Sequence, residues 1–243
     1  MSNNATIIIP ARVNSTRLPN KVMMDLAGEP MLARVIHRAS QAKTIDRVIV
    51  AIPNKSKDDD LASFCKKEGW LLYRGDEDDV LRRYYEAAMT FKVKVAVRLT
   101  QDCPLIDPSI IDKVVTSYYS VDDVDYATNT VVPYRTYPRG LDCEVIKIDA
   151  LQRAYFEDHS EWREHVTPYI YKNPDKFKIK YVTNDIDYSN LRWTVDTIED
   201  YAFVWHIFNY FKNDTFSWRD VLKVLEENPS WAKLNVDVEQ KTI

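Results

Sequence analysis

A short segment near the start of the chain concentrates side chains that could bind phosphate. Residues 10–21 read Pro-Ala-Arg-Val-Asn-Ser-Thr-Arg-Leu-Pro-Asn-Lys, and their three cations and two hydroxyl groups belong to Arg12, Arg17, Lys21, Ser15 and Thr16. Such a loop could wrap a triphosphate, because the cations neutralise it while hydroxyl and backbone N–H groups donate hydrogen bonds to its oxygens. The alternative is an ordinary solvated loop, since charged residues are exposed in most proteins.

Two further segments each place an aspartate where an apolar run ends. Asp102 lies in Thr-Gln-Asp-Cys-Pro, and Asp196 lies in Trp-Thr-Val-Asp-Thr. Two carboxylates at neighbouring strand ends could clamp one Mg²⁺ against phosphate oxygens, because Mg²⁺ takes a few hard oxygen ligands and leaves its other positions to water and substrate. The alternatives are a turn residue at Asp102 and a helix cap at Asp196. Thr197 is a second candidate for that cap.

Three more polar residues could contact a substrate. Arg139, in the turn Tyr-Pro-Arg-Gly-Leu-Asp, could meet an anionic group. His165 could bind a sugar hydroxyl or carboxylate, although a single histidine beside aromatic residues is more often packed for structural reasons. Arg82 could reach a nucleobase, although the acidic residues before it are ordinary complements of a helix dipole.

The elements that must position these residues alternate between strands and helices. Short apolar runs rich in β-branched residues predict strands at 5–9, 47–52, 70–73 and 94–99. Helical spacing predicts helices at 29–41, 58–68, 79–89 and 108–119. This alternation implies right-handed βαβ units around a mostly parallel sheet, the doubly wound α/β class. Ligands of such sheets bind beyond the carboxyl ends of the strands, where the cationic loop and Asp102 are expected.

The regular pattern weakens after residue 120. Strand-like stretches at 125–130, 141–148 and 177–183 and helical stretches at 150–156 and 162–171 predict a small mixed α+β insertion that extends the sheet and covers a ligand. A last strand at 191–195 and helices at 199–211 and 218–226 follow. We therefore expect one domain, 1–243, made of a nucleotide-binding half (1–120), an acceptor-binding lid and candidate dimerisation subdomain (121–190), and a C-terminal return (191–243).

The composition argues against several classes of protein. A net charge of −4, with Lys and Arg scattered among Asp and Glu, leaves no basic stripe for nucleic acid. The four glycines form neither a GxGxxG nor a GxxxxGK loop, and the three cysteines have no CxxC spacing. Neither a signal peptide nor an apolar run long enough to span a membrane occurs, so we expect a cytoplasmic protein without a membrane partner.

A series of motifs occurs in one fixed order along the chain. They are Ile-Pro-Ala-Arg with Ser-Thr-Arg-Leu-Pro-Asn-Lys (9–21), Leu-Ala-Gly-Glu-Pro-Met (26–31), Asp-Cys-Pro-Leu-Ile-Asp (102–107), Tyr-Pro-Arg-Gly-Leu-Asp (137–142), Arg-Glu-His-Val-Thr-Pro-Tyr (163–169) and Thr-Val-Asp-Thr-Ile-Glu-Asp (194–200). Together they resemble the cytidylyltransferases that make CMP-activated 3-deoxy-manno-octulosonate and CMP-sialic acids. The resemblance is strongest to the spore-coat polysaccharide biosynthesis protein F branch.

The resemblance implies a glycosyltransferase-A-like nucleotidyltransferase fold, CTP bound by the first loop, and Mg²⁺ held by Asp102 and Asp196. The residues expected to act in catalysis are Lys21, Arg17, Asp102 and Asp196. The residues expected to bind the nucleotide are Pro10, Ala11, Arg12, Ser15, Arg17, Lys21, Arg82 and Gln101. The residues expected to bind the acceptor are Arg139, His165 and Tyr169.

The chain departs from the family pattern at a few positions. Asn14 and Asn20 stand where the related loops have Gly, and Ile198 stands where they have Pro. Because Asn tolerates positive φ best among the other residues, both asparagines could adopt the turn conformation of glycine. The octulosonate enzymes have Gln-Gly-Asp-Glu-Pro where this chain has Thr-Gln-Asp-Cys-Pro, so the resemblance does not imply that particular sugar.

These observations lead to one principal hypothesis. The protein transfers CMP from CTP to an acidic sugar, such as a 2-keto-3-deoxy nonulosonic or octulosonic acid, and releases pyrophosphate on the way to a surface polysaccharide. One alternative keeps the fold but uses a sugar phosphate, polyol phosphate or phosphonate as acceptor. Another is a non-catalytic nucleotide-binding scaffold. A homodimer is also expected, because the aromatic-rich segment 118–188 could form an interface.

Overall fold

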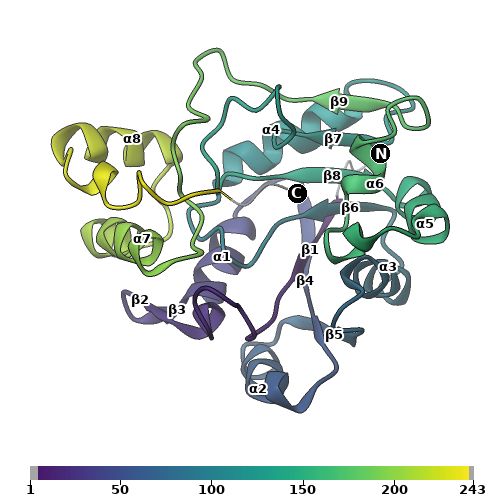
Figure 1. Cartoon of the computed structure of the whole chain (residues 1–243), viewed down its shortest axis with the longest axis horizontal. Coiled ribbons are helices and arrows are strands. Elements are labelled where there is room, and N and C mark those ends of the chain that lie inside the picture. Colours follow the sequence, from purple (N-terminus) through teal and green to yellow (C-terminus); the bar gives the residue numbers. More distant parts are fainter. Residues whose placement is uncertain (1–4, 241–243) are drawn as a thin grey trace.

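The computed structural model describes residues 5–240 and is built around one seven-stranded sheet (Figure 1). The strands lie in the order β5-β4-β1-β6-β8-β7-β9. Their bounds are β1 Ala5–Pro10, β4 Ile45–Pro53, β5 Leu71–Gly75, β6 Val95–Arg98, β7 Tyr126–Thr128, β8 Glu144–Lys147 and β9 Ile179–Tyr181. The first four strands in that spatial order are parallel, whereas β8 runs antiparallel to both β6 and β7. The predicted α/β class with a mostly parallel sheet is confirmed.

Helices cover both faces of this sheet. One face packs against α3 (Val80–Thr90), α5 (Ile148–Glu157) and α6 (Pro168–Tyr171). The other packs against α1 (Met31–Ala39), α2 (Asp59–Lys67), α4 (Pro108–Tyr119), α7 (Ile198–Phe211) and α8 (Trp218–Glu227). Short 3-10 helices occur at η1 Lys21–Met23, η2 Ser56–Asp58, η3 Glu161–Glu164 and η4 Trp231–Lys233. The two-sided packing makes this a doubly wound sheet.

The central strand β1 shows why the sequence folds this way. Ile7 and Ile9 belong to one apolar cluster, and Ile8 belongs to the cluster on the opposite face. Successive side chains of a strand point to opposite sides, and all three of these side chains are fully buried, so both faces of the strand are covered. A strand buried on both faces needs a continuous apolar run, and β-branched residues suit its extended backbone. The strand ends at Pro10, and the chain then leaves the sheet at its carboxyl edge.

The predicted last strand at 191–195 is wrong. This segment forms only an isolated bridge, between Arg192 and Arg139, and joins no ladder of the sheet. It is nevertheless held beside the end of β6, because the Val195 N–H donates a hydrogen bond to the Asp102 carbonyl at 2.8 Å. The apolar residues of the segment serve the core rather than a strand, since Trp193 and Val195 are buried in the cluster under α7.

Two other regions differ from the sequence-based expectation. The predicted loop at 11–28 contains η1 and strand β2 (Asp25–Leu26), which pairs with β3 (Glu29–Pro30) in a two-stranded ribbon. The predicted helix at 162–171 is instead η3 followed by the four-residue α6. Pro168 explains the break, because proline has no N–H for a continuing helix and is favoured at a new first turn.

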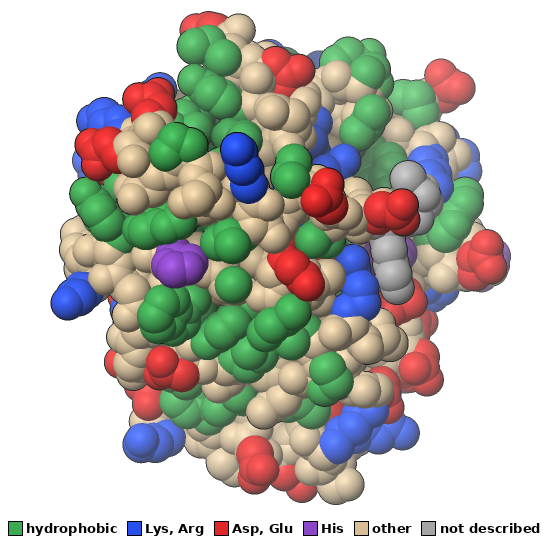
Figure 2. All heavy atoms as spheres, turned by 60° about the vertical axis from the view of Figure 1, so that its left-hand side comes forward, with side chains coloured by type: hydrophobic (Ala, Val, Ile, Leu, Met, Phe, Trp, Pro, Cys, Tyr) green, Lys and Arg blue, Asp and Glu red, His purple; other side chains and the backbone are tan. Residues whose placement is uncertain are grey.

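The surface of the C-terminal helices carries exposed apolar side chains. Figure 2 shows hydrophobic groups gathered on the side of the molecule that bears α7 and α8. On α7, Trp205 and Tyr210 remain 40% and 50% exposed. Within residues 5–240, no helix combines the length and the apolar character that crossing a membrane requires.

Candidate functional site

The loop after β1 is fastened by two side chains from distant parts of the chain. The Arg12 N–H donates to Gln101 Oε1 at 2.8 Å, and the Val13 N–H donates to Asp58 Oδ1 at 3.0 Å. Asp58 is fully buried. The predicted nucleotide-binding residue Gln101 therefore holds the loop backbone. These contacts fix the start of the loop relative to the carboxyl edge of the sheet.

The loop closes on itself before it reaches Lys21. The N–H groups of Ser15 and Asn20 both donate to the Val13 carbonyl, at 3.0 and 2.9 Å. Asn20 has φ 58° and ψ 19°, in the left-handed region. The predicted positive φ is confirmed at Asn20 and is wrong at Asn14, where the turn closed by the Ser15 N–H needs no left-handed residue.

Lys21 lies between the two predicted metal-binding aspartates. Its Nζ donates to Asp102 Oδ2 at 3.0 Å, to Asp196 Oδ1 at 2.9 Å and to the Val195 carbonyl at 2.7 Å. The side chain is only 4% exposed. Burial lowers the pKa of Lys21, but Asp102 and Asp196 outweigh that effect and keep its pKa above the usual value. Likewise, burial raises the pKa of Asp102, and Lys21 reverses the shift so that this pKa is lowered.

Asp196 is surrounded by further cations. Arg17 and Arg192 each approach Asp196 Oδ2, at 2.8 and 3.0 Å. Arg192 is held in turn by Asp200, to which it donates from both Nε and a terminal nitrogen. Asp196 is not the cap of α7, because the side chain of Thr197 and that of Asp200 form the capping box. The carboxylate of Asp196 is therefore not used by the helix cap, and its partners are the three cations Lys21, Arg17 and Arg192.

The donor set at this position suits a hard divalent cation. The carboxylates of Asp102 and Asp196 both touch the same Lys21 nitrogen, so they are close enough to share one ion. Within residues 5–240 no cluster of three or more His, Cys, Asp or Glu side chains could hold a metal. A metal here would thus have two protein carboxylates and would need water and substrate oxygens for its remaining positions, which is the usual coordination of Mg²⁺.

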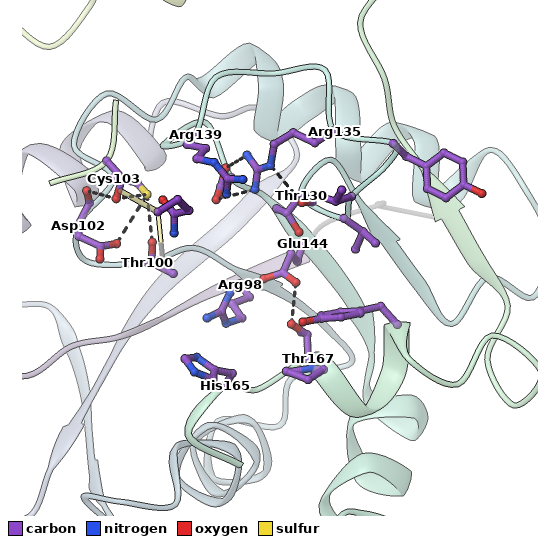
Figure 3. Close-up of a pocket in the computed structure, with 18 of the residues that line it drawn as sticks. Arg98, Thr100, Asp102, Cys103, Thr130, Arg135, Arg139, Glu144, His165 and Thr167 are labelled. Carbon is purple, nitrogen blue, oxygen red and sulfur yellow. Dashed lines mark hydrogen bonds and ion pairs between the residues drawn. The ribbon is translucent and has the colours of Figure 1, made fainter. Parts of the chain in front are cut away.

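A cavity of about 730 Å³ opens beside these aspartates. It lies between β6 and β8 on one side and the segments 130–142 and 165–172 on the other, and its lining includes Asp102 and Asp196. Figure 3 shows Arg139 and Arg135 along one side of the cavity, His165 and Thr167 along the opposite side, and Arg98 with Glu144 between them.

Two of the three arginines in the cavity are already paired. Arg98 forms an ion pair with Glu144, and Arg135 forms a two-pronged pair with Asp142 at 2.6 and 3.1 Å. Within the described part of the chain, no carboxylate forms an ion pair with Arg139. Burial, and then Arg135, lower the pKa of Arg139. An anion bound beside Arg139 would offset this effect, so Arg139 is the arginine of the cavity best suited to bind one.

The backbone of Arg139 is fixed close to the aspartate-bearing segment. The Trp193 N–H donates to the Arg139 carbonyl at 2.6 Å, and the Arg139 N–H donates to the Leu191 carbonyl at 2.9 Å. Gly140 has φ 106°, and a Cβ there would lie 2.5 Å from the Trp193 carbonyl carbon. Glycine thus permits the close approach of the Arg139 turn to the segment 191–194, which precedes Asp196.

His165 lines the cavity as predicted for an acceptor-binding residue. Burial, and then the charge of Arg98, lower its pKa, which favours the neutral imidazole. A neutral imidazole offers one hydrogen-bond donor and one acceptor, as a sugar hydroxyl requires.

Two predicted site residues lie elsewhere. Tyr169 does not line the cavity, because its hydroxyl donates to Glu157 at 2.8 Å and accepts from Lys176 at 2.7 Å in an exposed cluster. Arg82 is exposed and held by Glu86, four residues along α3, at 2.8 Å. Neither residue lines the cavity, and the expected contacts of Tyr169 with the acceptor and of Arg82 with the nucleobase stay predictions.

The remaining predicted nucleotide-binding residues stay at the start of the loop. Pro10 ends β1, and the buried Ala11 donates its N–H to the Ala51 carbonyl at 3.0 Å. The Arg12 side chain is one-third exposed and pairs with Glu164 at 2.8 Å. Arg12 therefore links the loop to the region that carries His165.

Sequence reasoning missed the charged network on the cavity floor. Glu144 is 3% exposed and accepts hydrogen bonds from Arg98, Tyr126 and Thr167. Arg98 and Glu144 sit in strands β6 and β8, where the other paired residues are apolar except Lys147 at the far end of β8. A charge inside an otherwise apolar strand was the available signal, because buried charges require a partner.

Comparisons with known proteins identify the family of the chain. The sequence profile described as Cytidylyltransferase matches residues 6–243. The chain is 30% identical to the spore coat polysaccharide biosynthesis protein SpsF of Bacillus subtilis, over 95% of this chain and 97% of that protein. It is 34% identical to the 3-deoxy-manno-octulosonate cytidylyltransferase of Chlorobium phaeovibrioides over 51% of this chain and 49% of that protein.

A solved structure extends the likeness to the whole fold. A cytidylyltransferase from Leptospira borgpetersenii superimposes with a TM-score of 0.89 and 33% identity, covering 99% of this chain and 100% of that one. A match over nearly the full chain, in both sequence and fold, shows more than a shared architecture. The chain therefore belongs to the cytidylyltransferase family of nucleotidyltransferases.

Proposed function

We propose that this enzyme transfers CMP from CTP to an acidic sugar, with release of pyrophosphate. The acceptor is a 2-keto-3-deoxy sugar acid of the nonulosonic or octulosonic kind, destined for a surface polysaccharide. The carrying observation is that loop cations and two aspartates meet at the rim of a cavity that also contains Arg139, which has no carboxylate partner among residues 5–240. The names of two relatives support the choice, since one is a polysaccharide biosynthesis protein and the other a 3-deoxy-manno-octulosonate enzyme.

The nucleotide is bound by the loop after β1. We assign the triphosphate to Arg12, Ser15, Arg17 and Lys21, with the loop backbone from Pro10 onward held in place through Gln101. Cations on a short, fastened loop can neutralise a polyphosphate without a large loss of conformational freedom.

Asp102 and Asp196 are the residues that would hold Mg²⁺. Their hard oxygen donors converge on one point, which supports this assignment. Bound there, the ion would supply positive charge to the phosphate oxygens during transfer.

The acceptor occupies the cavity. We assign its carboxylate to Arg139, and a sugar hydroxyl to the neutral His165 on the opposite side (Figure 3). The segment 121–190 supplies most of this half of the site, consistent with an acceptor-binding subdomain. Arg135 would attract an anion less strongly than Arg139, because Asp142 already neutralises the guanidinium of Arg135.

In the reaction, one phosphorus–oxygen bond forms and another breaks. The anomeric hydroxyl oxygen attacks the α-phosphorus in line with the bridging oxygen that leaves with pyrophosphate, and the hydroxyl proton passes to water. The chain contributes by orientation and by charge: Arg139 orients the acceptor, while Lys21 and Arg17 stabilise the charge that gathers on pyrophosphate.

A substrate screen tests this assignment. CTP, UTP, GTP and ATP are each combined with panels of 2-keto-3-deoxy acids, sugar phosphates, polyol phosphates and phosphonates, and pyrophosphate release is measured. Turnover only with CTP and an acid supports the proposal. Turnover with a phosphate or phosphonate would show that the acceptor is not a sugar acid. The absence of turnover with every pair would favour a nucleotide-binding scaffold.

Replacing Arg139 by glutamine is expected to raise the KM for the acceptor about 10- to 100-fold and to leave the KM for CTP nearly unchanged. The reason is that a hydrogen bond to a charged group contributes about 1.5–3 kcal/mol, and each 1.4 kcal/mol is about tenfold in affinity. Steady-state kinetics with each substrate varied in turn measures both constants. The exposed Arg219→Gln variant on α8 is the control. Equal changes in both KM values would argue that Arg139 does not read the acceptor.

We further propose that the enzyme works in the cytoplasm as a homodimer. Three free, buried cysteines suit a reducing compartment.

The dimer interface has two candidate surfaces. Val132 and Tyr134, 69% and 48% exposed, lie in the segment expected to form the interface. Helix α7 carries Trp205 and Tyr210 as the second exposed surface. Light scattering measures the molar mass of the wild type and of the Tyr134→Ser and Trp205→Ser variants. The variant whose changed side chain lies in the interface is expected to shift from dimer to monomer.

A further inference from the structure

Among residues 5–240, the charged groups joined by ion pairs around Lys21 form a neutral set. Three carboxylates and three cations contact one another in a chain of ion pairs, and their formal charges cancel. The ion pairs run through Asp102, Asp196, Asp200, Lys21, Arg17 and Arg192. A divalent cation arriving alone from solvent would therefore meet no net negative charge there, although two of its expected ligands are present.

Lys21 also fills the place that such a cation would take. Its ammonium touches one oxygen of each aspartate and a backbone carbonyl, all within 3.0 Å, and its side chain is 96% buried. The three N–H donors of an ammonium are matched by these three acceptors. An ion bridging Asp102 and Asp196 cannot occupy the same space as this nitrogen.

We propose that Lys21 is the positioning residue that stands in for the metal while no nucleotide is bound. The ammonium keeps the two aspartates together, and the metal binds between them only when Lys21 turns away to the phosphates of the nucleotide. This inference rests on the proposed function, since it takes Asp102 and Asp196 as the metal ligands.

The charges after the exchange support this order of events. If Lys21 and Arg17 both turn to the triphosphate, the three aspartates keep only Arg192 as a cationic partner, and the group is left with a net charge of −2. That charge matches one divalent cation. Lys21 belongs to the 3-10 helix η1 and to no strand of the sheet, and its flexible four-carbon stem allows the ammonium to change partners.

Binding of Mn²⁺ without nucleotide tests the proposal directly. Free Mn²⁺ is counted by its electron paramagnetic resonance signal while it is titrated into the wild type, Lys21→Met and Lys113→Met. Lys113 is a lysine on α4 whose partners are Tyr137 and the Thr183 carbonyl, so its loss leaves the aspartates untouched. We expect Lys21→Met to bind Mn²⁺ about tenfold or more tightly than the wild type and Lys113→Met.

A second measurement uses the wild type alone and does not depend on the variant folding. Mn²⁺ should bind at least about fivefold more tightly to the CTP complex than to the nucleotide-free enzyme, after correction for Mn²⁺ held by CTP in solution. Equal Mn²⁺ affinities of the nucleotide-free wild type and a folded Lys21→Met variant would overturn the role of Lys21. Equal Mn²⁺ affinities of the wild type with and without CTP would overturn it as well. If Asp102→Asn leaves Mn²⁺ binding to the CTP complex unchanged, it is instead the metal assignment of the proposed function that fails.

Discussion

Replacing Asp196 by asparagine is expected to lower kcat about 100-fold or more at saturating CTP and Mg²⁺. Asparagine keeps the shape of the side chain but removes the charge that would bind the metal, and it leaves Arg17 and Arg192 facing a neutral amide. Because the capping box of α7 uses Thr197 and Asp200, the helix itself should survive the change. Turnover is measured by pyrophosphate release, and the fold is checked by circular dichroism.

Asp214 provides a closely matched control for this experiment. Its side chain is 17% exposed, as that of Asp196 is, and it pairs with Arg34 at 2.8 Å, the same distance as Asp196 with Arg17. Asp214→Asn therefore removes an ion pair with the same N–O distance at a residue that does not line the cavity, and should keep nearly full turnover. If Asp196→Asn also keeps full turnover at saturating Mg²⁺, Asp196 does not hold the metal.

Replacing Glu144 by glutamine is expected to destabilise the protein by about 3–5 kcal/mol, because the change removes one partner of a buried ion pair and leaves the charge of Arg98 uncompensated. Glu144 is 3% exposed and accepts from three side chains on different elements. Burial lowers the pKa of Arg98, but Glu144 outweighs this and raises it, so Arg98 keeps its charge. The expected fall in melting temperature is about 6–20 °C.

Two further variants separate the loss of the pair from the loss of a carboxylate. The double variant Arg98→Met with Glu144→Leu removes both charges and should recover much of the stability, since an apolar pair of similar volume replaces a buried ion pair well. Glu86→Gln removes the half-buried partner of the exposed Arg82 and should change the melting temperature much less. A drop for Glu86→Gln as large as that for Glu144→Gln would contradict the importance of the buried network.

The elements that could be predicted from the sequence are those with local causes. Helix α4 was predicted with its observed bounds, because Pro108 suits a first helical turn and the Asp107 side chain accepts from the Ser109 N–H. The run Ile7–Ile9 identified a doubly buried strand by composition alone. Thr197 was recognised as a helix cap for the same reason, since a cap acts within its own turn.

The sequence also determined which residues could meet, through the rule that loops after parallel strands share one edge. Lys21 and Asp102 were both expected at that edge, and they are in contact. The segment that carries Asp196 also lies at this edge, but a different structural feature holds it there. It is not a strand, and the buried Trp193 and Val195 hold it against the core instead. The apolar residues of 191–195 could not distinguish a strand from an irregular segment, because both place such side chains in the core.

Only the tertiary structure decided how the charges are shared. Arg98, Arg135 and Arg139 look alike in the sequence, yet two of them have carboxylate partners in the described chain and Arg139 has none. The partners of Lys21 could not be identified from the sequence either, because they lie 81 and 175 residues away. The sequence determined the supply of cations and carboxylates, while their pairing depends on long-range packing, since the Coulomb interaction follows distance in space and not separation along the chain.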